Sequence, residues 1–151
     1  MIVIQEQVFD SAQLTEVLES KSTGFGATVS FTGTMRERAE TGDGLSGLYI
    51  EHYPAMTEQA LQEILDKAKQ QFNLLAVVLV HRVGTIGINE PIVYVGVTSS
   101  HRKDAFSACQ MIMDYLKNDA PFWKKEIHQS GKQEWVEQKS TDRESIGRWD
   151  K

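Results

Sequence analysis

The stretch that organises the chain runs from Ser99 to Lys125 and reads SSHRKDAFSACQMIMDYLKNDAPFWKK. Its middle has apolar residues at helical spacing, namely Ala105, Phe106, Cys109, Ile112, Met113 and Leu116. Such a stripe predicts an amphipathic helix that packs on a core and ends before Pro121. The basic side chains lie at the two ends of the stretch: His101, Arg102, Lys103, Lys117, Lys124 and Lys125. The middle is therefore predicted to be scaffold, and the ends to carry the chemistry.

The length of this helix limits where a site can be. His101 and Lys117 are sixteen residues apart, which is roughly 24 Å along a straight α-helix. One small ligand cannot touch both ends within one chain. Either the two ends are unrelated basic helix termini, or two chains meet so that the His101 end of one lies beside the Lys117 end of the other. We expect the second arrangement, a homodimer with a shared site.

Outward from this helix, the pattern predicts strands and helices intermingled along residues 1–151, taken as one domain. Strands are expected over residues 2–9, 27–34, 48–53, 74–83, 92–98, 123–127 and 134–139. Further helices are expected over residues 11–20 and 57–72, with a short helix or tail over residues 141–149. Residues 35–46 read as a mobile loop, and Gly84 and Gly87 as a turn. Short connections favour antiparallel strands, so we expect an α+β fold with the helices on one face of a mixed or antiparallel sheet.

Composition excludes several classes of protein. The net charge is −5 and the pI about 5.4, so no general basic surface for nucleic acid is expected. The single cysteine makes no disulfide, and the four histidines are not at metal-ligand spacing, so no metal or cofactor is expected. The N-terminus does not resemble a signal peptide, and the longest aliphatic run is too short to span a membrane. We therefore expect a cytoplasmic protein.

Two local patterns suggest an anion site. The residues before Arg102 follow a strand and open a helix, where backbone N–H groups and the helix dipole favour a phosphate or carboxylate; alternatively, a serine only caps the helix.

Lys117 borders the apolar stripe, and Lys124 follows Phe122 and Trp123. Lysines beside apolar surface can act as acids or bases, although packing of the stem with the ammonium in water is commoner. Arg36 follows a predicted strand and is either a site residue or a solvated loop charge.

Five motifs together carry a family resemblance. They are residues 29–36 (VSFTGTMR), 51–56 (EHYPAM), 81–84 (HRVG), 95–102 (VGVTSSHR) and 113–126 (MDYLKNDAPFWKKE). In this order they resemble the large, catalytic subunit of molybdopterin synthase over about residues 26–149. The first 25 residues match poorly, Met35 stands where a smaller aliphatic residue is expected, and the loop over residues 38–45 looks variable.

The resemblance implies an α/β hammerhead-like core with an additional antiparallel β subdomain. It also implies a sulfurtransferase that converts cyclic pyranopterin monophosphate (precursor Z) into molybdopterin. The two dithiolene sulfurs come from the C-terminal thiocarboxylate of a small ubiquitin-like partner, in a heterotetramer built on a dimer of large subunits. The residues that match catalytic positions are Lys117 and Lys124, and both also match substrate-binding positions. The other implied substrate-binding residues are Arg36, His101, Arg102, Lys125 and Glu126.

Two other functions fit the residues less fully. A stacking and phosphate surface for a nucleotide or nucleic acid could be formed by Phe122, Trp123, Lys103, Lys124 and Lys125, although the acidic pI disfavours it. A non-catalytic adaptor could dock a ubiquitin-like tail without turnover.

Overall fold

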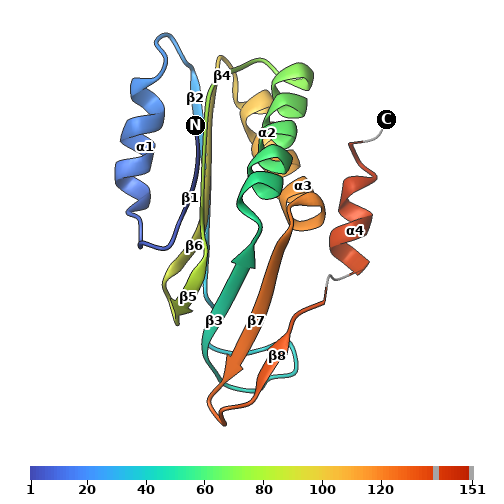
Figure 1. Cartoon of the computed structure of the whole chain (residues 1–151). Coiled ribbons are helices and arrows are strands. Elements are labelled where there is room, and N and C mark those ends of the chain that lie inside the picture. The colour runs from blue at the N-terminus through green and yellow to red at the C-terminus, as the bar shows by residue number, and fades with distance from the viewer. Residues whose placement is uncertain (138–139, 150–151) are drawn as a thin grey trace.

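A computed structural model describes residues 1–137 and 140–149 and shows two four-stranded sheets with helices packed around the first (Figure 1). The first sheet has the order β1 (Ile2–Gln5), β4 (Leu74–Arg82), β6 (Pro91–Ser99), β2 (Ala27–Thr34). β1 runs parallel to β4, and the other neighbours are antiparallel. The mixed sheet expected from the sequence is confirmed, although its first strand ends at Gln5 and not at Phe9.

Helices cover both faces of this sheet, so the expectation that they lie on one face was wrong. α1 (Ser11–Ser20) lies on one face, and α2 (Pro54–Gln71) and α3 (Arg102–Asp119) lie on the other (Figure 1). The reason is in β4 and β6, whose continuous apolar runs bury alternate side chains on opposite faces. Val78 and Val80 join Leu18 of α1 in one core, while Val77 and Leu79 join α2 and α3 in the other.

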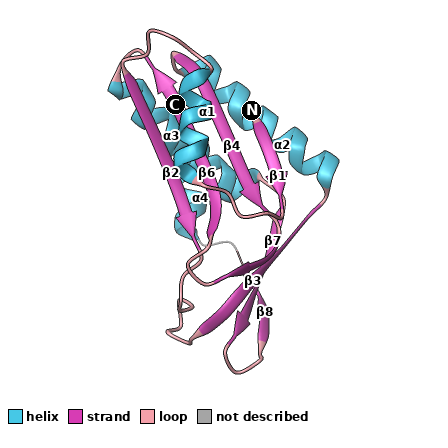
Figure 2. Cartoon of the chain, turned by 90° about the vertical axis from the view of Figure 1, so that its left-hand side faces the viewer, coloured by secondary structure: helices cyan, strands magenta, loops and turns pink. Residues whose placement is uncertain are grey.

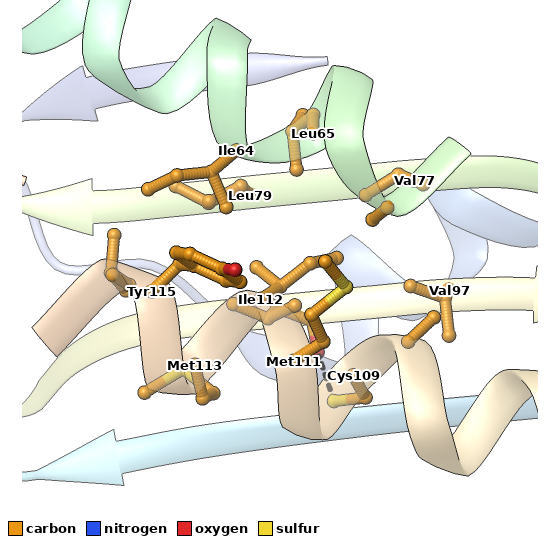
Figure 3. Packing of buried hydrophobic residues seen from close by; sticks show 14 of the residues in the cluster. Ile64, Leu65, Val77, Leu79, Val97, Cys109, Met111, Ile112, Met113 and Tyr115 are labelled. Atoms are coloured by element: carbon orange, nitrogen blue, oxygen red, sulfur yellow. Dashed lines mark hydrogen bonds between the residues drawn. The ribbon is translucent and has the colours of Figure 1, made fainter. Parts of the chain in front are cut away.

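The core under α2 and α3 is the larger one, and it confirms most of the predicted stripe of α3 (Figure 3). Cys109 is buried there, 3.8 Å from the carbonyl oxygen of Val95. Burial raises the pKa of the Cys109 thiol to about 11, so this thiol is inert at neutral pH. Phe106 does not belong to this core, because its side chain is 62% exposed. α2 begins at Pro54, a residue type that suits the first position of a helix.

The second sheet extends beyond one end of the first (Figure 2). Its order is β5 (Gly84–Gly87), β3 (Leu45–His52), β7 (Phe122–His128), β8 (Gln133–Trp135), all antiparallel. β5 was predicted as a turn, yet it pairs with β3 and buries Ile86 completely. The left-handed backbone of Gly84, with φ +79°, lets the chain leave β4 and enter this second sheet.

The C-terminal part agrees with the prediction only in outline. β8 (Gln133–Trp135) overlaps only two residues of the strand expected over residues 134–139, and residues 138–139 of that prediction lie outside the described part of the chain. α4 (Ser140–Ile146) confirms a short terminal helix. In the predicted loop over residues 35–46, Met35 and Ala39 are buried in a third core, which they form with Leu48 and Ile50 of the second sheet. Across the described residues, no helix is long and apolar enough to cross a membrane.

Candidate functional site

The structure divides the predicted site residues between two ends of the first sheet. Ala27 of β2 lies opposite Ser99 of β6, and Thr34 lies opposite Pro91. Since α3 follows β6 closely and runs back along it, His101 and Arg102 lie at the first of these ends. The C-terminal turn of α3, with Lys117, returns to the second end, where Arg36 follows β2 and β7 begins. The length of the helix predicts that one protomer keeps His101 and Arg102 apart from Lys117, and the structure agrees.

Lys124 lies on the inner face of the second sheet. It is opposite Ile50 of β3, which is buried, and it shares a strand face with Phe122 and Glu126 because side chains alternate along a strand. Lys124 itself is half-buried. Glu126, two residues further, lies opposite Leu48. This face points toward the junction between the two sheets.

Lys125 lies on the other face of β7. Its ammonium is 5.3 Å from the ring centre of Tyr49 and 5.3 Å from that of Trp135, a distance at which cation–π attraction operates. The sequence interpretation placed Lys125 beside the same pocket as Lys124 and Glu126. In the structure, Lys124 and Glu126 share one face of β7, and Lys125 lies on the opposite face.

The face that carries Lys125 borders an open groove of about 720 Å³. Its lining combines aromatic and acidic side chains, including Tyr49, Tyr53, Trp123, Trp135, Glu6 and Glu51. Tyr53 and Trp123 meet edge to face with 5.2 Å between ring centres. Sequence reasoning missed this groove because its lining comes from five separate segments of the chain. Its acidic rim does not suit the phosphate of the predicted substrate.

His81 is the residue near Lys124 that sequence reasoning did not single out for function. It is the next-to-last residue of β4 and only 3% exposed. Its Nδ1 lies 2.7 Å from the carbonyl oxygen of Arg82. Burial, and then the nearby charge of Lys124, lower the pKa of His81 to about 3, so its ring is uncharged at neutral pH. The signal in the sequence was a histidine that interrupts the end of a long apolar strand.

The predicted anion-binding residues are exposed. The Arg36 guanidinium donates to the Glu40 carboxylate at 2.7 Å, within the same loop. His101 is the N-cap residue of α3, with no capping hydrogen bond from its side chain. The serine expected to cap the helix does something else, since the Ser99 hydroxyl donates to the carbonyl of Asn73. His101 and Arg102 therefore stay available to a ligand at the solvent-facing start of the helix.

Comparison with known proteins identifies the family. The sequence model described as "MoaE protein" matches residues 4–119. The chain belongs to the MoaE family. The molybdopterin synthase catalytic subunit of Pasteurella multocida is 46% identical over 148 residues, covering 98% of this chain and 97% of that relative. These matches include most of the first 25 residues, which the motif-based resemblance had left out.

Solved structures agree. The MoaE protein from Burkholderia ambifaria superposes with a TM-score of 0.84 at 39% identity, covering 99% of this chain and 97% of that one. A chain in the complex of subunits 1 and 2 of molybdopterin-converting factor from Helicobacter pylori has a TM-score of 0.76 at 20% identity, covering 92% of each chain, and shows the shared fold. As a MoaE protein, the chain is an enzyme subunit of molybdenum cofactor biosynthesis.

Proposed function

We propose that this MoaE protein is the catalytic subunit of molybdopterin synthase and acts as a sulfurtransferase in the cytoplasm. It converts precursor Z into molybdopterin with sulfur from the C-terminal thiocarboxylate of a small ubiquitin-like subunit. The observation that carries the proposal is the similarity to catalytic subunits over almost the whole chain, which includes the segments that hold Lys117 and Lys124. A dithiolene needs two sulfur atoms, so two thiocarboxylate tails are used for each molybdopterin.

The two lysines are assigned the proton transfers and the binding of the thiocarboxylate tail. Lys124 is half-buried beside an uncharged histidine, and Lys117 closes the last turn of α3 near the start of β7. An ammonium group in a partly desolvated position both attracts a thiocarboxylate and can donate or accept a proton. Arg36, His101 and Arg102 are assigned to the phosphate and other anionic groups of precursor Z, as charge-assisted donors.

Lys125 and Glu126 receive supporting roles. Glu126 shares the strand face of Lys124 and is assigned to the pocket, whereas Lys125 stabilises the outer face of β7 between two aromatic rings. We therefore assign a contact with the substrate to Glu126, and we give Lys125 the structural role on the outer face.

The sulfur must come from another molecule. Cys109 is the single cysteine of the chain. It is buried, and its raised pKa keeps it as a thiol at neutral pH. A buried protonated thiol neither attacks nor carries sulfur efficiently. This state of Cys109 supports a sulfur donor outside this chain, such as the tail of the small subunit.

The placement of α3 and β2 supports a two-fold dimer with a shared site. β2 is an edge strand of the first sheet, and Phe31 on it lies opposite Val95, the residue whose carbonyl faces Cys109 near the middle of α3. Phe31 is 42% exposed and Phe106 of α3 is 62% exposed. A two-fold axis that passes near Phe31 and the middle of α3 would bury both phenylalanine rings in the dimer interface.

The same axis would run the two α3 helices antiparallel. His101 and Arg102 of one protomer would then lie beside Lys117 and Lys124 of the other, which completes one anion pocket at each end of the dimer. With one small subunit at each pocket, the assembly is a heterotetramer.

Reconstitution tests the proposed function. The purified protein is mixed with a thiocarboxylated small subunit and precursor Z, and molybdopterin is measured. We expect molybdopterin in proportion to the thiocarboxylate supplied. Binding of the small subunit without product would show an adaptor and overturn the proposal. Tight, salt-sensitive binding to oligonucleotides without product would instead favour the nucleic-acid alternative.

A further inference from the structure

Three stacked rings join the two sheets beside Lys124. Phe122, the first residue of β7, packs against the core under α2 and α3 and against the core that contains Leu48 and Ile50. On one side its ring lies parallel to that of His81 of β4, with 3.8 Å between centres and 11° between planes. On the other side lies His52 of β3, with 6.3 Å between centres and 30° between planes. The stack therefore links one strand of the first sheet to two strands of the second.

The His81 end of the stack is firmly held. A carbonyl oxygen only accepts hydrogen bonds, so Nδ1 of His81 donates to Arg82 and the lone pair is on Nε2. The buried guanidinium of Arg82 donates to the carbonyl oxygens of Glu6 and Pro91 at 2.9–3.1 Å. These bonds fix the end of β4, and with it the plane of the His81 ring.

Lys124 lies one strand repeat beyond the stack. It is two residues after Phe122, so both side chains point from the same face of β7, about 6.6 Å apart along the strand. The ammonium is close enough for its charge to lower the pKa of His81. A protonated histidine at this place would repel the ammonium, whereas the uncharged ring does not.

We infer that His81 is a positioning residue for Lys124. Its uncharged ring holds Phe122 at the start of β7, and β7 in turn holds the Lys124 ammonium at the junction of the two sheets. Because the His81 ring is uncharged, it adds no positive charge of its own beside that ammonium. The inference rests on the catalytic role proposed above for Lys124, and it assigns His81 no contact with substrate.

A double-mutant cycle tests this inference. His81→Ala and His81→Phe are made in the wild-type protein and in Lys124→Ala, and single-turnover molybdopterin formation is measured in the reconstituted complex. Misplacement of a catalytic group by about 1 Å costs up to ~100-fold in rate. We therefore expect His81→Ala to lower kcat by roughly tenfold or more with little change in KM for the small subunit. His81→Phe, which keeps a ring against Phe122, should recover most of the rate.

The background variant separates positioning from a general structural effect. If His81 acts through Lys124, His81→Ala lowers the rate no further once Lys124 is alanine. Val78→Ala, on the same strand but facing α1, controls for lost packing and should lower Tm while kcat is kept. If His81→Ala does not fold, Phe122→Leu is used in its place. It removes the middle ring of the stack and so tests the same positioning of Lys124.

The outcomes that contradict the inference are distinct from those that contradict the proposed function. Equal losses from His81→Ala in both backgrounds, no loss in the wild-type background, or no recovery with His81→Phe would each overturn the positioning role alone. A wild-type rate in Lys124→Ala would overturn the proposed role of Lys124, and the inference with it.

Discussion

Lys124 and Lys125 are adjacent in sequence but belong to opposite faces of β7. Lys124 points to the sheet junction near His81, and Lys125 lies between Tyr49 and Trp135 over the outer groove. The two lysines therefore have different surroundings: Lys124 is half-buried at the junction of the sheets, and Lys125 lies against aromatic rings. At the scale of single residues, the burial and the neighbours of each lysine decide what it can do.

The proposed catalytic lysines give the first prediction. Lys117→Ala and Lys124→Ala should each lower turnover by about 10²–10⁴-fold, the range for loss of a general acid or base. Tm should change little, because Lys117 is exposed and Lys124 is half-buried. Lys69→Ala, on the exposed side of α2, is the matched control and should keep full activity. Near wild-type turnover in both lysine variants would show that the assignment is wrong.

His81 gives a prediction for stability against pH. The pKa of His81 is about 3 in the folded protein and near 6.5 when unfolded, so the unfolded chain takes up the proton first as the pH falls. This contribution to the free energy of unfolding is complete above about pH 7 and is lost toward pH 3. Between pH 7 and pH 4 the loss is roughly 3 kcal/mol.

His81→Phe removes that proton uptake. Urea unfolding at pH 7 and pH 4 should therefore show a smaller loss of stability in the variant than in the wild-type protein. An equal loss in both proteins would mean that His81 titrates alike in the folded and unfolded states.

At the scale of elements, α3 and β2 present an unusual combination. α3 buries nearly all of its predicted stripe but leaves Phe106 exposed, and the neighbouring edge strand leaves Phe31 exposed. Exposed apolar residues on adjacent elements mark an interaction surface more often than isolated ones do. Edge strands also favour pairing with another chain. These features fit the proposed dimer.

Phe106→Asp should therefore weaken the dimer. Burial of one Phe side chain stabilises by about 1.5–3 kcal/mol. A two-fold interface contains Phe106 from both protomers, so the substitution removes this contribution twice. We expect the dissociation constant of the dimer to rise at least ~100-fold, measured by analytical ultracentrifugation. Val8→Asp, at an exposed apolar position before α1, is the matched control and should leave the mass unchanged. A Phe106→Asp protein that stays fully dimeric would place the interface elsewhere.

At the scale of the whole molecule, the proposed shared site uses a second chain to bring together residues from the two ends of the first sheet. Arg102→Ala and Lys117→Ala dimers should each be inactive, because each pocket needs Arg102 from one protomer and Lys117 from the other. Mixed dimers made by co-expression regain one intact pocket out of two, so activity should return in proportion to the mixed species. Mixed dimers that form, as seen by mass spectrometry of differently tagged chains, but stay inactive would contradict the shared site.

Local periodicity was enough to predict much of this protein. The apolar stripe of α3, which includes Cys109, and the strands β4 and β6 depend on residues within one or two turns or strand repeats of each other. The length of α3 alone already excluded a site that joins His101 and Lys117 in one chain. The five motifs indicated the family, which the comparisons confirmed.

Other features were decided only by the tertiary structure. Gly84–Gly87 is a strand because β3, more than thirty residues earlier in the chain, offers it a partner. α1 covers the opposite face from α2 because β4 and β6 are apolar on both sides. His81 meets Phe122 and Lys124 only because β4 and β7 converge where the two sheets join. Strand pairing and ring stacking act between residues that are distant in the chain, so no local pattern around either partner records them.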